Sequence, residues 1–138
     1  MENYSKSVFK AAEKRNILVV EGQALVRRAI MAELKRGGFS VEGADSCRMA
    51  QMQTDKCTPD LVIVNSDVGE ESGFDIVRNF LLWPSLRGIP IMMTSESHAT
   101  HQILLAMSMG IVEYITLPFA SGEILKRVRK FFRLTTTG

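Results

Sequence analysis

Short apolar runs alternate with amphipathic stretches along most of the chain. The apolar runs are rich in β-branched residues, as is typical of strands buried on both faces of a parallel sheet, and they cover residues 17–20, 39–42, 61–64, 89–94 and 112–116. After each run, apolar residues recur at helical spacing, over about residues 25–36, 46–54, 74–83, 100–109 and 122–133. The pattern therefore predicts five strands alternating with five helices.

Two of these helices have the clearest patterns. In the first, we predict an inward stripe of Leu25, Val26, Ala29, Ile30 and Leu34, with Arg27, Arg28, Glu33, Lys35 and Arg36 on the opposite face and Gly37 and Gly38 at its end. In the last, Ser121 is the expected N-cap, and the inward residues are Ile124, Leu125, Val128, Phe131 and Phe132.

Such alternation predicts an α/β fold, namely a doubly wound five-stranded parallel sheet with helices on both faces. We place one domain at residues 16–133, between an N-terminal extension of residues 1–15 and a C-terminal tail of residues 134–138. In this architecture ligands bind at the carboxyl ends of the strands. The residues that follow each strand are therefore the candidates for function.

Composition and charge narrow the possible classes of protein. A net charge of +2 is too small to indicate nucleic-acid binding, and the basic residues of the last helix alternate with apolar ones, as on a solvated helix face. No apolar run is long enough for a membrane span or a signal peptide, so we expect a cytoplasmic protein. Cys47 and Cys57 lack the spacing of a zinc site, and no cofactor is expected.

The residues at the predicted strand ends belong to recognisable phrases. Together these phrases resemble the receiver domains of bacterial response regulators over about residues 16–133; they are ILVVEG at residues 17–22, PDLVIVN at 59–65, Gly73, PIMMTS at 90–95 and GIVEYITLPF at 110–119. The resemblance implies the flavodoxin-like receiver fold. It also implies a chemistry in which an aspartate after the third strand accepts a phosphoryl group, with magnesium held by acidic residues after the first strand.

Three positions depart from that chemistry. Asn65 stands at the position of the phosphoacceptor, and its neutral amide lacks the charge needed to attack phosphorus or to bind magnesium well. Glu21 and Gly22 replace the acidic pair, and we interpret Glu21 as a solvated carboxylate rather than a metal ligand. Leu117 replaces the lysine that would pair with the phosphoryl group. Asp67 is not expected to reach the position of the missing carboxylate.

Other receiver features are kept. Ser95 and Tyr114 stand at the two switch positions, and Pro118 and Phe119 keep a turn in which the peptide before proline can be cis. We therefore interpret the chain as a degenerate pseudo-receiver with no metal and no enzymatic activity. His98 and His101 are expected at the surface, because no Ser or Cys nucleophile accompanies them.

Two classes of function remain open. The first is a protein-interaction module of two-component signal transduction, which binds a signalling protein or a second copy through the fourth helix, fifth strand and fifth helix, with Arg127, Arg129 and Lys130 at the rim. The second is a sensor input domain of a larger regulator, such as a transcription regulator, that responds to a small molecule, thiol or hydroxyl change. Neither a membrane nor nucleic acid is an expected partner of this domain.

Overall fold

The computed structural model describes residues 14–136, with side chains as far as Arg133. Each predicted strand and helix is present; in chain order they are β1 (Asn16–Val20), α2 (Ala24–Arg36), β2 (Ser40–Ala44), α3 (Cys47–Lys56), β3 (Leu61–Asn65), α4 (Gly73–Leu82), β6 (Ile91–Ser95), α5 (Thr100–Ser108), β7 (Glu113–Thr116) and α6 (Glu123–Thr136). Most of the predicted N-terminal extension lies outside the described residues. Helix α6 continues three residues into the predicted C-terminal tail.

Three short elements were not predicted. Strands β4 (Asp67–Val68) and β5 (Glu71–Ser72) form a small antiparallel hairpin directly after β3, and a 3-10 turn, η1 (Pro84–Leu86), follows α4. Two-residue strands are too short to produce an alternating pattern, so the hairpin could not be predicted. Its position matters for the functional site.

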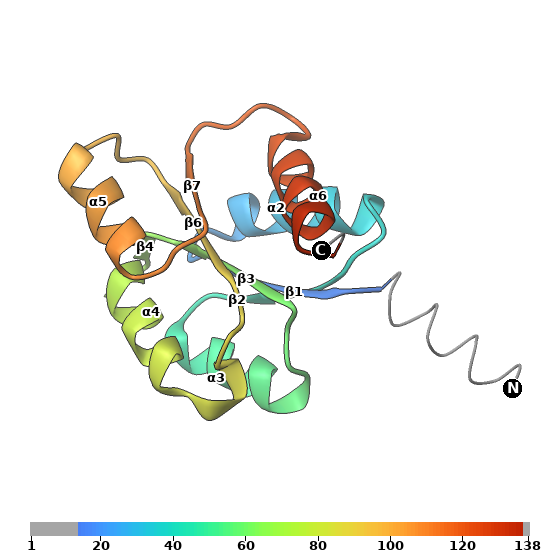
Figure 1. Cartoon of the computed structure of the whole chain (residues 1–138), viewed down its shortest axis with the longest axis horizontal. Helices are drawn as coiled ribbons and strands as arrows, with labels where there is room; N and C mark the ends of the chain where they lie inside the picture. Colours follow the sequence, from blue (N-terminus) through green and yellow to red (C-terminus); the bar gives the residue numbers. More distant parts are fainter. Residues whose placement is uncertain (1–13, 137–138) are drawn as a thin grey trace, which may run out of the picture.

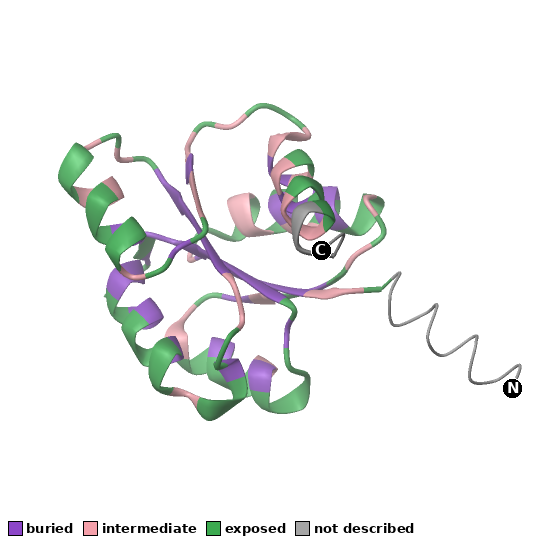
Figure 2. Cartoon of the chain, viewed as in Figure 1, coloured by how far each residue is buried: buried purple, intermediate pink, exposed green. Residues whose placement is uncertain are grey.

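The five long strands form one parallel sheet in the order β2-β1-β3-β6-β7. Helices α2 and α6 cover one face of the sheet, whereas α3, α4 and α5 cover the other (Figure 1). The central strands are buried on both sides, as Figure 2 shows, and β3 and β6 are buried at every position. The prediction of a doubly wound parallel α/β sheet is confirmed.

The predicted inward stripe of α2 is partly wrong. Ile30 and Leu34 are buried, but Leu25 is 80% exposed and Ala29 is also exposed. The first turn of α2 lies beside the segment that follows β7, with Leu25 and Phe119 lining the same depression, rather than over the sheet. Glu33, predicted on the solvated face, is instead buried, with 7% of its surface exposed.

Glu33 also explains why Ser121 is not the N-cap of the last helix. Helix α6 begins at Glu123, two residues after Ser121. The carboxylate of Glu33 accepts hydrogen bonds from the backbone N–H groups of Gly122 and Leu125, at 2.7 and 2.9 Å. A buried side chain from α2 thus satisfies the first N–H groups of α6, which a serine hydroxyl was expected to do.

Candidate functional site

The carboxyl ends of four strands lie side by side at one edge of the sheet. Val20 of β1 is in register with Val64 of β3, Asn65 of β3 with Thr94 of β6, and Ser95 of β6 with Thr116 of β7. This register brings the predicted site residues to the same edge, at the point where the strand order reverses between β1 and β3.

Asn65 is the last residue of β3 and is buried, with 7% of its surface exposed. Its side-chain Nδ2 donates to Thr94 Oγ1 at 3.0 Å, and its Oδ1 accepts from the backbone N–H of Asp67 at 2.8 Å. A backbone N–H can only donate, so the amide oxygen must face Asp67. Both ends of the amide are therefore engaged within the protein. Asp67 itself is exposed, in line with the expectation that its side chain does not replace the missing carboxylate.

Glu21 follows β1, and the prediction of a solvated carboxylate at this position was wrong. The residue is 3% exposed, and its Oε2 accepts the backbone N–H of Gln23 at 3.0 Å. Burial raises the pKa of the Glu21 carboxyl, because a charged group is less stable away from water, while the N–H groups of Gln23 and Gly22 and the charge of Arg27 lower it in part. The Glu21 carboxylate thus bonds to the backbone of its own segment, two residues further along the chain.

Gly22 has no room for a side chain. A Cβ atom at this position would lie 2.6 Å from the backbone nitrogen of Gly69 and 3.2 Å from the carbonyl carbon of Val68. Val68 is the last residue of β4, and Gly69 begins the turn to β5 with a φ of +62°. The hairpin turn therefore occupies the space that a carboxylate at position 22 would need.

A chain of hydrogen bonds links β3, β6 and β7 beside Asn65. Ser66 Oγ lies 2.7 Å from Ser95 Oγ, and both residues are buried. Ser95 Oγ also accepts the backbone N–H of Ser97 at 3.0 Å, and the carbonyl oxygen of Ser97 accepts the Tyr114 hydroxyl at 2.9 Å. The resemblance to receiver domains predicts Ser95 and Tyr114 at the switch positions, but nothing in the sequence singled out Ser66. A serine after a strand is too common to single out without the distance to its partner.

Leu117 lies outside this network. Its side chain lines an open apolar depression of about 580 Å³, together with Leu25, Val26, Ala29, Glu96, Pro118 and Phe119. The peptide between Leu117 and Pro118 is cis, as the sequence allowed. Leu117, at the position of the expected lysine, thus presents an apolar side chain beside α2.

These residues do not fit a magnesium ion. Asn65 offers a neutral oxygen that is already bonded, Gly22 offers no side chain, and within residues 14–133 no three His, Cys, Asp or Glu side chains are grouped closely enough to hold a metal.

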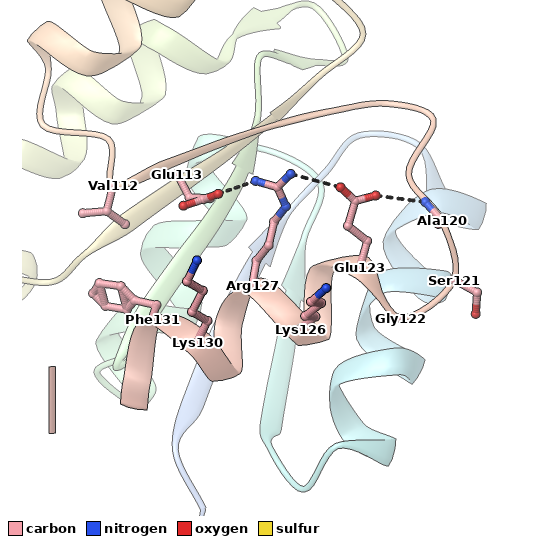
Figure 3. Close-up of a pocket in the computed structure, with 10 residues that line it drawn as sticks. All are labelled: Val112, Glu113, Ala120, Ser121, Gly122, Glu123, Lys126, Arg127, Lys130 and Phe131. Atoms are coloured by element: carbon pink, nitrogen blue, oxygen red, sulfur yellow. Dashed lines mark hydrogen bonds and ion pairs between the residues drawn. The ribbon is translucent and has the colours of Figure 1, made fainter. Parts of the chain in front are cut away.

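The predicted interface residues do not share one surface. A groove of about 940 Å³ lies between β7 and α6. In it, Arg127 bonds Glu113 on one side and Glu123 on the other (Figure 3). Lys126 and Lys130 line the same groove. Arg129, in contrast, donates to the carbonyl oxygen of Gly37 at 3.2 Å, at the end of α2. Arg127 and Arg129 therefore lie on different sides of α6.

Comparisons with known proteins agree with this architecture. The model of the response regulator receiver domain matches residues 17–129. The virulence transcriptional regulatory protein PhoP of Salmonella typhimurium is 27% identical over 118 residues, which cover 85% of this chain and 51% of PhoP. The KDP operon transcriptional regulatory protein KdpE of Escherichia coli is 25% identical over 118 residues, or 86% of this chain and 51% of KdpE. The chain thus spans about half the length of these relatives.

Solved structures show the same fold. The chemotaxis protein CheY4 of Vibrio cholerae superposes with a TM-score of 0.79 at 20% identity, covering 85% of this chain and 98% of CheY4. A response regulator from Thermotoga maritima has a TM-score of 0.75 at 26% identity, covering 85% of this chain and 96% of its own. Among the helices of the described residues, none has the length and apolar character needed to cross a membrane.

Proposed function

The chain belongs to the response regulator receiver family of two-component signalling, and we propose that it is a receiver that does not accept a phosphoryl group at Asn65. The observation that carries this proposal is the buried amide of Asn65, which bonds Thr94 and Asp67 through its two ends. An amide nitrogen or oxygen in that state is a poor nucleophile, because it carries no charge.

The surroundings support the same conclusion. The turn at Gly69 fills the space that an acidic side chain at position 22 would need to reach a metal. Leu117 provides no positive charge for a phosphoryl oxygen, and its side chain lines the apolar depression instead. Loss of the nucleophile, one acidic residue and the cation at three separate strand ends removes three groups on which the family's phosphoryl transfer depends, whereas the Ser95 hydroxyl is kept.

We expect phosphodonors to leave the domain unchanged. Acetyl phosphate or beryllofluoride, each added with magnesium, should produce no saturable change in the amide chemical shifts of residues 65–67 and 95. The measurement is a two-dimensional NMR titration, with a receiver that has aspartate at this position as a positive control for the reagents. Saturable shifts centred on residues 65–67 would contradict the proposal.

The matched variant is Asn65→Asp. It restores the nucleophile alone, so it should still fail to form a stable acyl phosphate, because Gly22 and Leu117 supply neither metal nor phosphoryl contacts. Stable labelling of this variant would show that the pocket needs only an aspartate, and that the changes at positions 22 and 117 are without effect.

We propose further that the domain acts by binding a protein, a signalling protein or a second copy, through α5, β7 and α6. Helix α5 contains no Asp, Glu, Lys or Arg, and it exposes 63% of Leu104 and 53% of Met107. Val112 and Phe131 line the adjacent groove beside Lys126 and Lys130 (Figure 3). Apolar surface with a charged rim is typical of interfaces between proteins.

Charge reversal at Lys126 and Lys130 should weaken binding of the partner, whether a signalling protein or a second copy, by at least about tenfold in the dissociation constant. Tenfold corresponds to about 1.4 kcal/mol, and like-charge contacts at an interface cost at least that much. Both side chains are exposed, so the free energy of unfolding should change by less than about 0.5 kcal/mol. Sedimentation equilibrium measures the association. Arg129→Glu is the control, because Arg129 lies on the other side of α6. Equal weakening by the control, or none by the lysine pair, would move the interface elsewhere.

A further inference from the structure

We infer that the hydroxyl of Ser66 holds the switch residue Ser95, and through it Tyr114, in one position in the absence of any phosphoryl group. The inference rests on the proposed function in one respect. A phosphoryl group would compete for the Ser95 hydroxyl, so Ser66 can be its permanent partner only if no phosphoryl group is transferred to the domain. Ser66 acts on Tyr114 through other groups, so it is a positioning residue.

The contact between the hydroxyls of Ser66 and Ser95 is short and shielded from water. The two Oγ atoms are 2.7 Å apart, the usual distance for an O–H···O hydrogen bond, and the residues are 5% and 0% exposed. Ser95 is the last residue of β6, so its Cα is fixed by the parallel pairing with β7. Without water to compete, the Ser66 hydroxyl decides where the Ser95 side chain points.

The orientation of Ser95 is transmitted to β7 through Ser97. Ser95 Oγ accepts the N–H of Ser97 at 3.0 Å, which fixes the peptide turn after β6. The carbonyl oxygen of Ser97 then accepts the hydroxyl of Tyr114 at 2.9 Å. Tyr114 packs against the core beneath α5 and belongs to β7, so it lies within the surface that we propose for partner binding. The polar groups of the site are thereby connected to that surface.

Neither Thr94, Leu117 nor Asp67 can take over from Ser66. The Thr94 hydroxyl is bonded by Asn65, and Leu117 has no donor. Asp67 Oδ2 lies 3.5 Å from Ser66 Oγ, which is too long to compete with the 2.7 Å contact to Ser95. Removing the Ser66 hydroxyl would leave Ser95 Oγ with the Ser97 N–H as its remaining contact, and the side chain could then rotate.

Tyr114 provides the readout. The sequence contains two tyrosines, and a Tyr4→Phe background leaves Tyr114 as the one tyrosine that can be labelled with 13C. In this background, Ser66→Ala should shift the ring signals of Tyr114, and Ser95→Ala should shift them in the same direction. The double variant should show no larger shift than Ser95→Ala alone, because Ser66 acts on Tyr114 through the Ser95 hydroxyl. Ser108→Ala is the matched control, since the Ser108 hydroxyl bonds only Leu105 of its own helix, and it should leave Tyr114 unchanged.

A measurement on the unsubstituted serines keeps the inference testable if Ser66→Ala does not fold. In half-deuterated water, a buried and bonded hydroxyl exchanges slowly enough to split the Cβ resonance of its serine into protonated and deuterated forms. We expect this splitting at Ser66 and Ser95, and an averaged single resonance at the exposed Ser108. An averaged Ser66 resonance would overturn the inference.

The outcomes separate this inference from the proposed function. Unchanged Tyr114 signals in folded Ser66→Ala would overturn the role of Ser66 and leave the loss of phosphoryl transfer untouched. Conversely, a phosphodonor response centred on residues 65–67 of the wild-type domain would overturn the proposed function, while a Tyr114 shift in Ser66→Ala would still show that Ser66 positions the switch.

Discussion

Replacing Gly73 with alanine is expected to lower the free energy of unfolding by about 3 kcal/mol, the upper end of the usual cost of forcing an atom into a packed site. The added Cβ would overlap the Asn65 carbonyl oxygen and lie 2.8 Å from both the Asn65 carbonyl carbon and the Ser66 Cα. These are backbone atoms of the strand end that carries the candidate site. The backbone N–H of Gly73 also donates to the Ser66 carbonyl oxygen at 2.7 Å, so the two segments cannot separate without losing this bond.

Urea denaturation measures the loss, and the melting temperature should fall by roughly 10 °C for a domain of this size. Gly88→Ala is a suitable control. Gly88 has a φ of +80° and open space around its Cα, so alanine there meets only the backbone cost of the left-handed region, about 1 kcal/mol. Equal losses in the two variants would show that the contact with residues 65 and 66 is not the cause.

The long strands and helices could be predicted because their buried residues follow the pattern of apolar residues in the sequence. Residues 61–64 and 91–94 are apolar or β-branched and are buried on both faces of the sheet, so the pattern and the structure coincide. At the partly exposed edge strand β2, the same reasoning placed the strand one or two residues early. The prediction was weakest where burial was least complete.

The location of the candidate site could also be predicted, because the residues that follow the strands of a parallel sheet come together at one edge. The environment of those residues was not readable. Glu21 is buried rather than solvated, and the hairpin turn over Gly22 comes from a segment more than 40 positions away. Ser66 gains its importance from a hydroxyl on another strand. Such facts depend on tertiary distances, which no local pattern contains.

Helix α2 is a second case in which a contact between two elements could not be predicted from the sequence. Its polar residue Glu33 follows the helical period of a solvated face, yet the neighbouring helix α6 covers it and uses it. Glu33 Oε1 and Oε2 receive the N–H groups of Gly122 and Leu125, and the Leu125 side chain packs against Gly37 at the end of α2. A carboxylate that is buried under a second helix is satisfied by that helix, and periodicity along α2 alone cannot reveal it.

Replacing Glu33 with alanine is therefore expected to cost about 2 kcal/mol of unfolding free energy, because two N–H groups at the start of α6 lose a charged acceptor. The helix N-terminus also loses a favourable negative charge. Glu42→Ala is the matched control: Glu42 is exposed on β2, and its replacement should change stability by less than about 0.5 kcal/mol. Amide hydrogen exchange gives the local result. The Leu125 amide should exchange roughly thirtyfold faster in Glu33→Ala, which corresponds to about 2 kcal/mol. If exchange at Leu125 stayed at the wild-type rate while global stability fell, Glu33 would stabilise the packing of α2 rather than the start of α6.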